Sequence, residues 1–303
     1  MRSLAGFAMR GRSQAALVAA GSAVLSLVLP LVAVISSAVV ALATLRQGAR
    51  EGLLVAGIAG LGSGALAWLA LGTPWPGLGF LAVLWVPLWA LALILRVTRN
   101  LALTAQGAAL IGLLILLGLH LVTDDPAAYW ARILEPLRAS LVEGGVVEEA
   151  ASQALIGGLS KWMTGAFAAS LYVQFLLALL LGRWWQAVLY NPGGFGAEFR
   201  GLRLSPVLGY AALALIGLRL WQPEAMWGFE LLALILPLLF LQGLAVVHGV
   251  RHSLGAGVGW LAGLYVLLVV AMPYAEVLVS GLGLADLWLD VRGRAARRAA
   301  GRS

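Results

Sequence analysis

Long uncharged stretches alternate with short charged ones along the whole chain. The first runs from Ala15 to Leu45 without a charged side chain and is interrupted only by Pro30. A membrane-spanning helix needs about 20 apolar residues, so this stretch is too long for one helix and short for two. Because proline disfavours a helix interior, and the residue before it avoids the α region, we predict a turn near Pro30 between two short spans.

Further apolar stretches of helical length follow, which brings the candidate spans to ten. They are Leu53–Leu71, Leu78–Leu95, Leu101–Val122, Trp162–Leu181, Val207–Leu220, Gly228–Val247, Gly255–Met272 and Tyr274–Leu289. We favour ten spans within a range of eight to ten; the last contains Asp286 and two glycines, and as an interfacial helix it would lower the count to nine. The fold class is therefore all-α, a polytopic transmembrane helix bundle, because a barrel needs alternating strands that this pattern lacks.

The distribution of charge tests this order of spans, because cytoplasmic loops of membrane proteins collect arginine. With the N-terminus inside, all but four of the 20 basic residues, from Arg2 to Arg302, fall on one side. The four are Arg132, Arg138, Lys161 and Arg219. Eight acids fall on the other side: Asp124, Asp125, Glu135, Glu143, Glu148, Glu149, Glu224 and Glu276. We predict a multi-pass protein of the bacterial inner membrane with both termini cytoplasmic, a single polytopic domain over 1–291 and a basic tail over 292–303.

Composition supports the membrane assignment and excludes some chemistry. The chain is 62% hydrophobic and 11% charged, with a mean hydropathy of +0.96, whereas soluble domains are about a quarter charged. The absence of cysteine excludes disulfides, thiolate nucleophiles and Cys-ligated metal. The net charge of +7 is explained by arginines in cytoplasmic loops, so no nucleic-acid partner is expected. Gly60 and Gly64 form a GxxxG pattern that predicts close helix packing.

The segment between about 124 and 160 differs from the rest. Asp125 followed by Pro126 is typical of a helix start, with an Asp N-cap and Pro at the first helical position. An apolar stripe at helical spacing follows, and Gly144 and Gly145 interrupt it before a second amphipathic stretch. We predict two amphipathic extracytoplasmic helices, either a packed connection or a lid over a cavity that opens outward.

The loop from Tyr190 to Leu204 is longer than a turn requires. Asn-Pro and Gly-Gly are turn signals, yet charged and aromatic residues follow them. Glycine-rich turns expose backbone N–H groups that hold anions, and arginine adds charge. The alternatives are a structural turn, or a docking or anion loop made of Asn191, Pro192, Gly193, Gly194, Phe195, Glu198, Arg200 and Arg203.

Three short segments carry a family resemblance. They are Arg10-Gly11-Arg12 before an Ala-rich first helix, the turn 191–199, and the ending 283–292. They resemble the uncharacterised YybS-like predicted membrane proteins of bacteria, which are distantly similar to the substrate-binding S components of energy-coupling-factor transporters. The resemblance implies small-solute binding and a first helix that docks a coupling subunit through an AxxxA pattern, which Ala15/Ala19 and Ala16/Ala20 match. The usual S component has six spans, fewer than predicted here.

Few polar residues lie within the predicted spans. His120, Arg219, Glu230 and Glu276 lie near the outer ends of their spans, where they either extend to the interface or converge on an outer polar site. Gln174 and Gln242 are mid-span and predict hydrogen bonds between helices.

No catalytic pattern is present, since the chain has neither HExxH nor GxSxG. His248 and His252 lie four residues apart at a helix end, where an interfacial role is favoured over a metal site. We therefore expect no enzyme, no cofactor and no metal. The first hypothesis is a transport-type protein, S-component-like, that binds a small solute in a cavity that opens outward, beneath the outer segment. The alternative is a membrane scaffold that docks a membrane or cytoplasmic protein through Asn191–Arg203.

Overall fold

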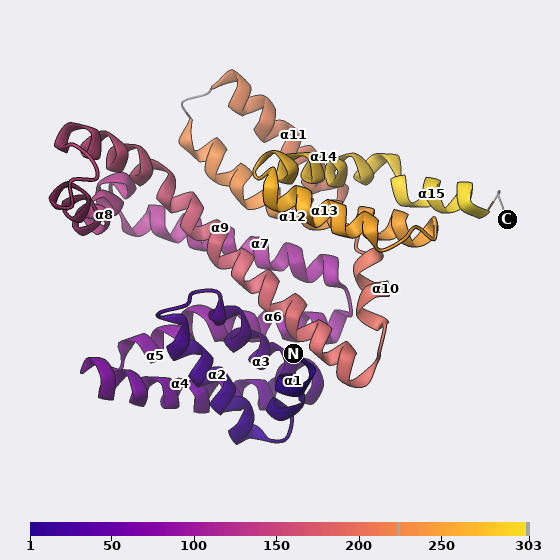
Figure 1. Ribbon diagram of the computed structural model, residues 1–303, viewed down its shortest axis with the longest axis horizontal. Coiled ribbons are helices and arrows are strands. Elements are labelled where there is room, and N and C mark those ends of the chain that lie inside the picture. The colour runs from indigo at the N-terminus through magenta and orange to yellow at the C-terminus, as the bar shows by residue number, and fades with distance from the viewer. Residues whose placement is uncertain (223–224, 301–303) are drawn as a thin grey trace. The chain divides into compact units, whose positions relative to one another are not determined.

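The protein is helical throughout the part of the chain that its computed structural model describes, residues 1–222 and 225–300 (Figure 1). No strand occurs in these residues, so the all-α prediction is confirmed. Glu224 and Arg302, which entered the charge argument, lie outside the described residues.

The helices form two compact units, Met1–Ala108 with Leu171–Leu202 (unit 1) and Ala109–Ser170 with Arg203–Ser303 (unit 2). Unit 1 contains α1 (Arg2–Ala8), α2 (Arg12–Ser26), α3 (Val32–Gln47), α4 (Ala49–Leu71), α5 (Trp75–Gly79), the π-helix η1 (Phe80–Trp85), α6 (Val86–Thr98) and α10 (Gly194–Arg200). Unit 2 contains α8 (Pro126–Glu143), α11 (Pro206–Trp221), α12 (Met226–Ser253), α13 (Gly259–Val270), α14 (Tyr274–Leu289) and α15 (Val291–Ala300). The helices α7 (Leu101–Val122) and α9 (Glu149–Tyr190) contribute residues to both.

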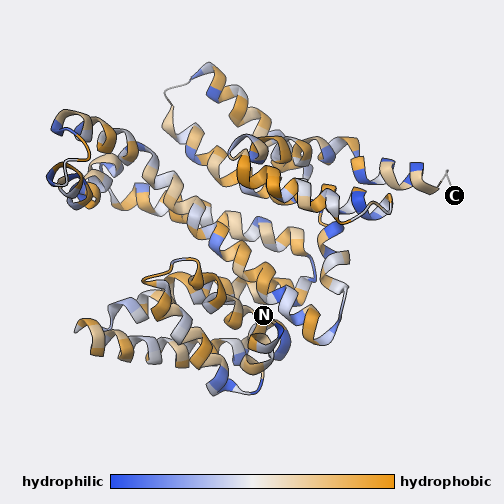
Figure 2. Cartoon of the chain, viewed as in Figure 1, coloured by the Kyte–Doolittle hydropathy of each residue, from blue (hydrophilic) through white to orange (hydrophobic). Residues whose placement is uncertain are grey.

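Helix length and composition agree with an integral membrane protein. Among the described residues, five helical stretches are long and apolar enough to cross a membrane: α4, Trp75–Thr98, α7, α9 and α12. Shorter apolar helices are α3, α11 and α13. Figure 2 shows apolar residues along the long helices and hydrophilic ones mainly near their ends. The helices α2 and α14 have 15 and 16 residues, about 24 Å at most, which is less than the hydrocarbon thickness of about 30 Å.

The predicted turn at Pro30 is confirmed. The helix α2 ends at Ser26 and α3 begins at Val32. An ion pair of 2.5 Å between Arg12 and Glu51 joins the first turns of α2 and α4, so α3 runs in the opposite direction between them. The end of α3, with Arg46, therefore lies at the same end of unit 1 as Arg12, as the charge argument requires.

Glycine allows two close helix contacts. In unit 1, a Cβ added to Gly60 would lie 3.2 Å from Leu81 of η1, so the predicted packing role of this GxxxG pattern is confirmed. In unit 2, a Cβ on Gly243 of α12 would overlap the carbonyl oxygen of Val279, and one on Gly283 of α14 would overlap that of Leu239. The backbones of α12 and α14 therefore touch at a level where only glycine fits.

The segment after residue 123 begins as predicted and then departs from the prediction. The carboxylate of Asp125 accepts a hydrogen bond of 3.0 Å from the Ala128 amide, so the N-cap is confirmed. Trp130 is buried and donates to Thr164 Oγ1 at 3.0 Å, which fixes α8 on α9. The second amphipathic stretch is not a separate helix: it is the beginning of α9, which continues for 42 residues. Glycine costs only about 1 kcal/mol in a helix, so Gly157 and Gly158 do not end it.

Candidate functional site

Three helices and a turn bring arginines together at one end of unit 1. Arg46 lies in the last turn of α3, and Arg96 in the last turn of α6. Arg99 ends α6 in the left-handed conformation, with φ of 52°. Arg183 comes from α9, which turns at Gly193 into α10. Because α3, α6 and α9 all end here, arginines that are far apart in sequence become neighbours.

These arginines line a cavity of about 610 Å³. Its other lining residues include Gln186, Gly194 and Glu198, and we call it the arginine pocket. Four arginines face one glutamate, so the wall carries an excess of positive charge. Arg183 forms an ion pair of 2.7 Å with Glu198, which connects α9 to α10.

Hydrogen bonds hold the wall of the arginine pocket in place. The carbonyl oxygen of Leu45 accepts two hydrogen bonds, one of 2.6 Å from Arg96 and one of 3.2 Å from Gln186. The guanidinium carbon of Arg46 lies 4.1 Å from the ring centroid of Tyr190, a cation–π contact. In the part of the chain that is described, Arg46, Arg96 and Arg99 form no ion pair with a carboxylate. Their positive charge is therefore available to an anion.

The predicted loop contributes only part of this pocket. Gly194 and Glu198 line it, whereas Asn191, Pro192 and Gly193 form the turn before α10. Phe195 packs on Phe199 with 5.9 Å between ring centroids, and Arg200 ends α10. Arg203 belongs to unit 2. Sequence reasoning used the pocket arginines only as topology signals and missed the site, because their convergence depends on how the helices pack; they are Arg46, Arg96, Arg99 and Arg183.

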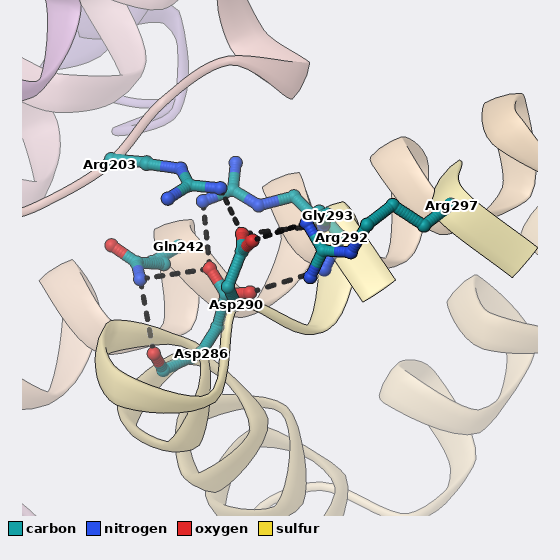
Figure 3. Close-up of polar contacts among 8 residues, drawn as sticks. Arg203, Gln242, Asp286, Asp290, Arg292, Gly293 and Arg297 are labelled. Atoms are coloured by element: carbon teal, nitrogen blue, oxygen red, sulfur yellow. Dashed lines mark hydrogen bonds and ion pairs between the residues drawn. The ribbon is translucent and has the colours of Figure 1, made fainter. Parts of the chain in front are cut away.

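A second polar cluster lies at one end of unit 2 (Figure 3). Hydrogen bonds between helices were predicted for Gln174 and Gln242; those of Gln242 are present, whereas Nε2 of Gln174, in unit 1, is buried without a hydrogen-bond partner among the described residues. The side-chain oxygen of Gln242 accepts a hydrogen bond of 2.7 Å from the Leu204 amide. Its side-chain nitrogen donates hydrogen bonds of 3.2 Å to the Gly283 carbonyl and 3.3 Å to the Asp286 carboxylate. One buried amide of α12 therefore connects the start of α11 to α14.

Two ion pairs complete this cluster. Arg292 donates a hydrogen bond of 2.8 Å to the Asp286 carboxylate, and both side chains are buried. Asp290 accepts a hydrogen bond from Arg203 and lies 3.6 Å from Arg297 (Figure 3). The Arg203 hydrogen bond holds the pKa of Asp290 below its ordinary value. The basic tail therefore begins as a helix, α15, that is fixed to unit 2 by Arg292.

The predicted outer polar site is brought together in part. His120 Nε2 lies 3.4 Å from the Glu230 carboxylate, which is 4% exposed. A Cβ on Gly165 of α9 would lie 2.8 Å from the Glu230 side chain, so this glycine gives the carboxylate its space. Arg219 ends α11 with a buried Nη1 that has no hydrogen-bond partner among the described residues. Glu276 lies in the first turn of α14 and makes no described ion pair with the other three.

The alanines of the first predicted span are not exposed. Ala15, Ala16, Ala19 and Ala20 of α2 are all at most 6% exposed, and Ala19 accepts a hydrogen bond from Ser36 of α3 at 2.7 Å. They pack inside unit 1, so they do not form the free AxxxA docking stripe that the resemblance implies.

Comparison of the chain with family profiles, curated proteins and solved structures finds no match. The resemblance to YybS-like proteins therefore stays a prediction. Within residues 1–222 and 225–300, no group of three or more His, Asp or Glu side chains is placed to hold a metal ion.

Proposed function

We propose that this integral membrane protein binds a small water-soluble anion in the arginine pocket of unit 1, in a transport-type role without a catalytic step. The observation that carries the proposal is the cavity of about 610 Å³ with four arginines and one glutamate in its wall. Small-molecule sites measure about 300 to 1,000 Å³, so its size fits a metabolite-sized ligand.

The chemistry of the wall favours an anion with several oxygens. Arginine presents a planar fork of donors that matches carboxylate and phosphate groups. The amide of Gln186 and the ion pair of Arg183 with Glu198 make the remaining wall polar. A hydrated, charged ligand would therefore exchange its water for donors that are already fixed by the packing of α3, α6 and α9.

The arginine pocket is a different binding site from the one that the sequence suggested for a solute. The sequence suggested a solute site under the outer segment, whereas the arginines of the pocket belong to the basic set that the positive-inside rule assigns to the cytoplasm. We therefore place the anion site on the cytoplasmic side. Docking of a partner through Asn191–Arg203 has less support, because Glu198 and Arg203 are each occupied by an ion pair within their own unit.

A binding titration tests the proposal. Purified protein in detergent is titrated with inorganic phosphate, sulfate and citrate, and binding is followed by calorimetry. Arg99→Gln removes a charge from the pocket without breaking a described contact, and should weaken binding about tenfold, the usual order for one charged hydrogen bond. Arg50→Gln removes a charge at the same end of unit 1 but outside the pocket and should bind as wild type. Equal affinity of Arg99→Gln and wild type for every bound anion, or binding of none, would reject the proposal.

A further inference from the structure

An apolar groove lies beside the basic tail helix of unit 2. The cavity measures about 490 Å³ and lies between the end of α12, the end of α14 and α15. Its lining combines apolar residues with two arginines, Arg294 and Arg298; the apolar ones are Val250, Leu254, Leu289, Val291 and Ala295. None of the described residues that line it is acidic, so the groove combines an apolar wall with two positive charges.

The arginines of α15 divide by what they face. Arg292 and Arg297 form ion pairs with Asp286 and Asp290. Arg294 and Arg298 are exposed, lie four residues apart on one face of the helix, and form no ion pair with a carboxylate in the described chain. The two nearby carboxylates therefore neutralise one pair of arginines of α15, and the other pair lines the groove.

We propose that this groove binds one anionic phospholipid of the cytoplasmic leaflet, with the phosphate between Arg294 and Arg298 and an acyl chain along Val250, Leu254 and Leu289. Basic pockets at the cytoplasmic ends of membrane helices suit anionic headgroups. A water-soluble anion would leave the apolar wall uncovered, whereas a lipid covers it and keeps its phosphate in reach of both guanidinium groups. This lipid site is independent of the anion proposed for unit 1, whose pocket has polar walls.

The position of the groove supports this occupant. The helix α12 is apolar and long enough to span a membrane, and its end and the end of α14 meet basic residues that the positive-inside rule assigns to the inner membrane surface. Arg292 is buried against Asp286, which holds α15 beside the groove rather than free in solution. The two lipid-facing arginines are therefore fixed at the level where lipid phosphates lie.

Native mass spectrometry of the full chain tests the proposal, with phosphatidylglycerol and phosphatidylcholine as the two probes. Wild type should retain phosphatidylglycerol in preference to phosphatidylcholine. Arg294→Gln/Arg298→Gln should weaken retention of phosphatidylglycerol roughly thirtyfold, because each arginine near an anionic lipid contributes separately. Arg2→Gln/Arg10→Gln removes the same net charge from unit 1 and should retain the lipid as wild type does.

A second variant tests the apolar part of the site. Ala295→Leu keeps both arginines and fills space at the groove that Ala295 lines, so it should also reduce retention of phosphatidylglycerol several-fold. It remains informative even if the double arginine variant fails to fold. Three results would overturn the lipid site: equal loss in the two double variants, equal retention of both lipids by wild type, or displacement of the lipid by water-soluble glycerol phosphate at the same concentration.

Discussion

Asp286 and Arg292 form an ion pair of 2.8 Å whose two side chains are 1% and 8% exposed. Arg292 follows Asp286 by six positions, and α14 ends between them, at Leu289 with Asp290 as its C-cap. The pair therefore fastens the first turn of α15 to the last turn of α14, beside the Gln242 side chain that bonds the same carboxylate.

Asp286→Asn should destabilise the protein by about 3 to 5 kcal/mol, because it leaves the buried charge of Arg292 without its partner. The measurement is unfolding in detergent, monitored by circular dichroism. Replacing both partners in Asp286→Leu/Arg292→Met should cost much less, since no uncompensated charge remains. Stability of Asp286→Asn equal to wild type would show that the pair does not hold α15 in place.

Substitutions at two glycines of α14 should distinguish the effect of close contact with α12 from the effect of helix propensity. Gly283→Ala should destabilise by about 1 to 3 kcal/mol, because its Cβ would meet the backbone of α12. Gly281→Ala, two residues away, places its Cβ where nothing lies within 4 Å and should leave stability unchanged or slightly raised. Thermal unfolding of the two variants makes the comparison, and equal effects would contradict the close packing of these helices.

Acid should weaken the ion pair that Arg138 forms with Glu135 within α8. Arg138 donates to Glu135 and also forms an ion pair of 2.5 Å with Glu149 at the start of α9. The hydrogen bond from Arg138 holds the pKa of Glu135 below its ordinary value. Because the folded-state pKa is the lower one, this stabilisation is complete above the unfolded pKa of about 4.3 and is lost as pH falls through the folded-state value.

Wild type should therefore unfold at a higher temperature than Arg138→Gln at pH 6. This difference in unfolding midpoint should become smaller below about pH 4. Arg132→Gln, which removes an arginine of the same helix that has no described ion pair, should show no such pH dependence. A difference between wild type and Arg138→Gln that stays constant down to pH 3 would contradict this role of Glu135.

Single cysteines on this cysteine-free chain test the orientation in the membrane. Gly77 and Gly293 are unsuitable for cysteine substitution, because a Cβ at either position would overlap neighbouring atoms. Exposed positions elsewhere in the chain serve better. Cysteine replacing Gln47, Ala197 or Ala296 should react only with permeant maleimide, and cysteine replacing Ser140 or Gln222 with impermeant maleimide from outside. Labelling of Gln47→Cys from outside would reverse the assignment of the arginine pocket to the cytoplasm.

The sequence alone determined the features that depend on neighbouring residues or on the average polarity of a segment. A proline within an apolar stretch was enough to place the turn at Pro30, and Asp125 before Pro126 was enough to place a helix start. Helix type and the apolar character of the spans followed from composition. These signals are local, because backbone sterics and capping act within one helical turn.

Only the tertiary structure decided which distant side chains meet. Arg46, Arg96 and Arg183 lie far apart in the chain and form one pocket because α3, α6 and α9 end together. Ala15 to Ala20 looked available for docking, yet α3 and α4 cover them. The segment 292–303 was predicted as a basic tail, but the buried carboxylate of Asp286 binds its first residue, Arg292. Helix ends converge through packing, and packing depends on shape complementarity between surfaces that no single stretch of sequence contains.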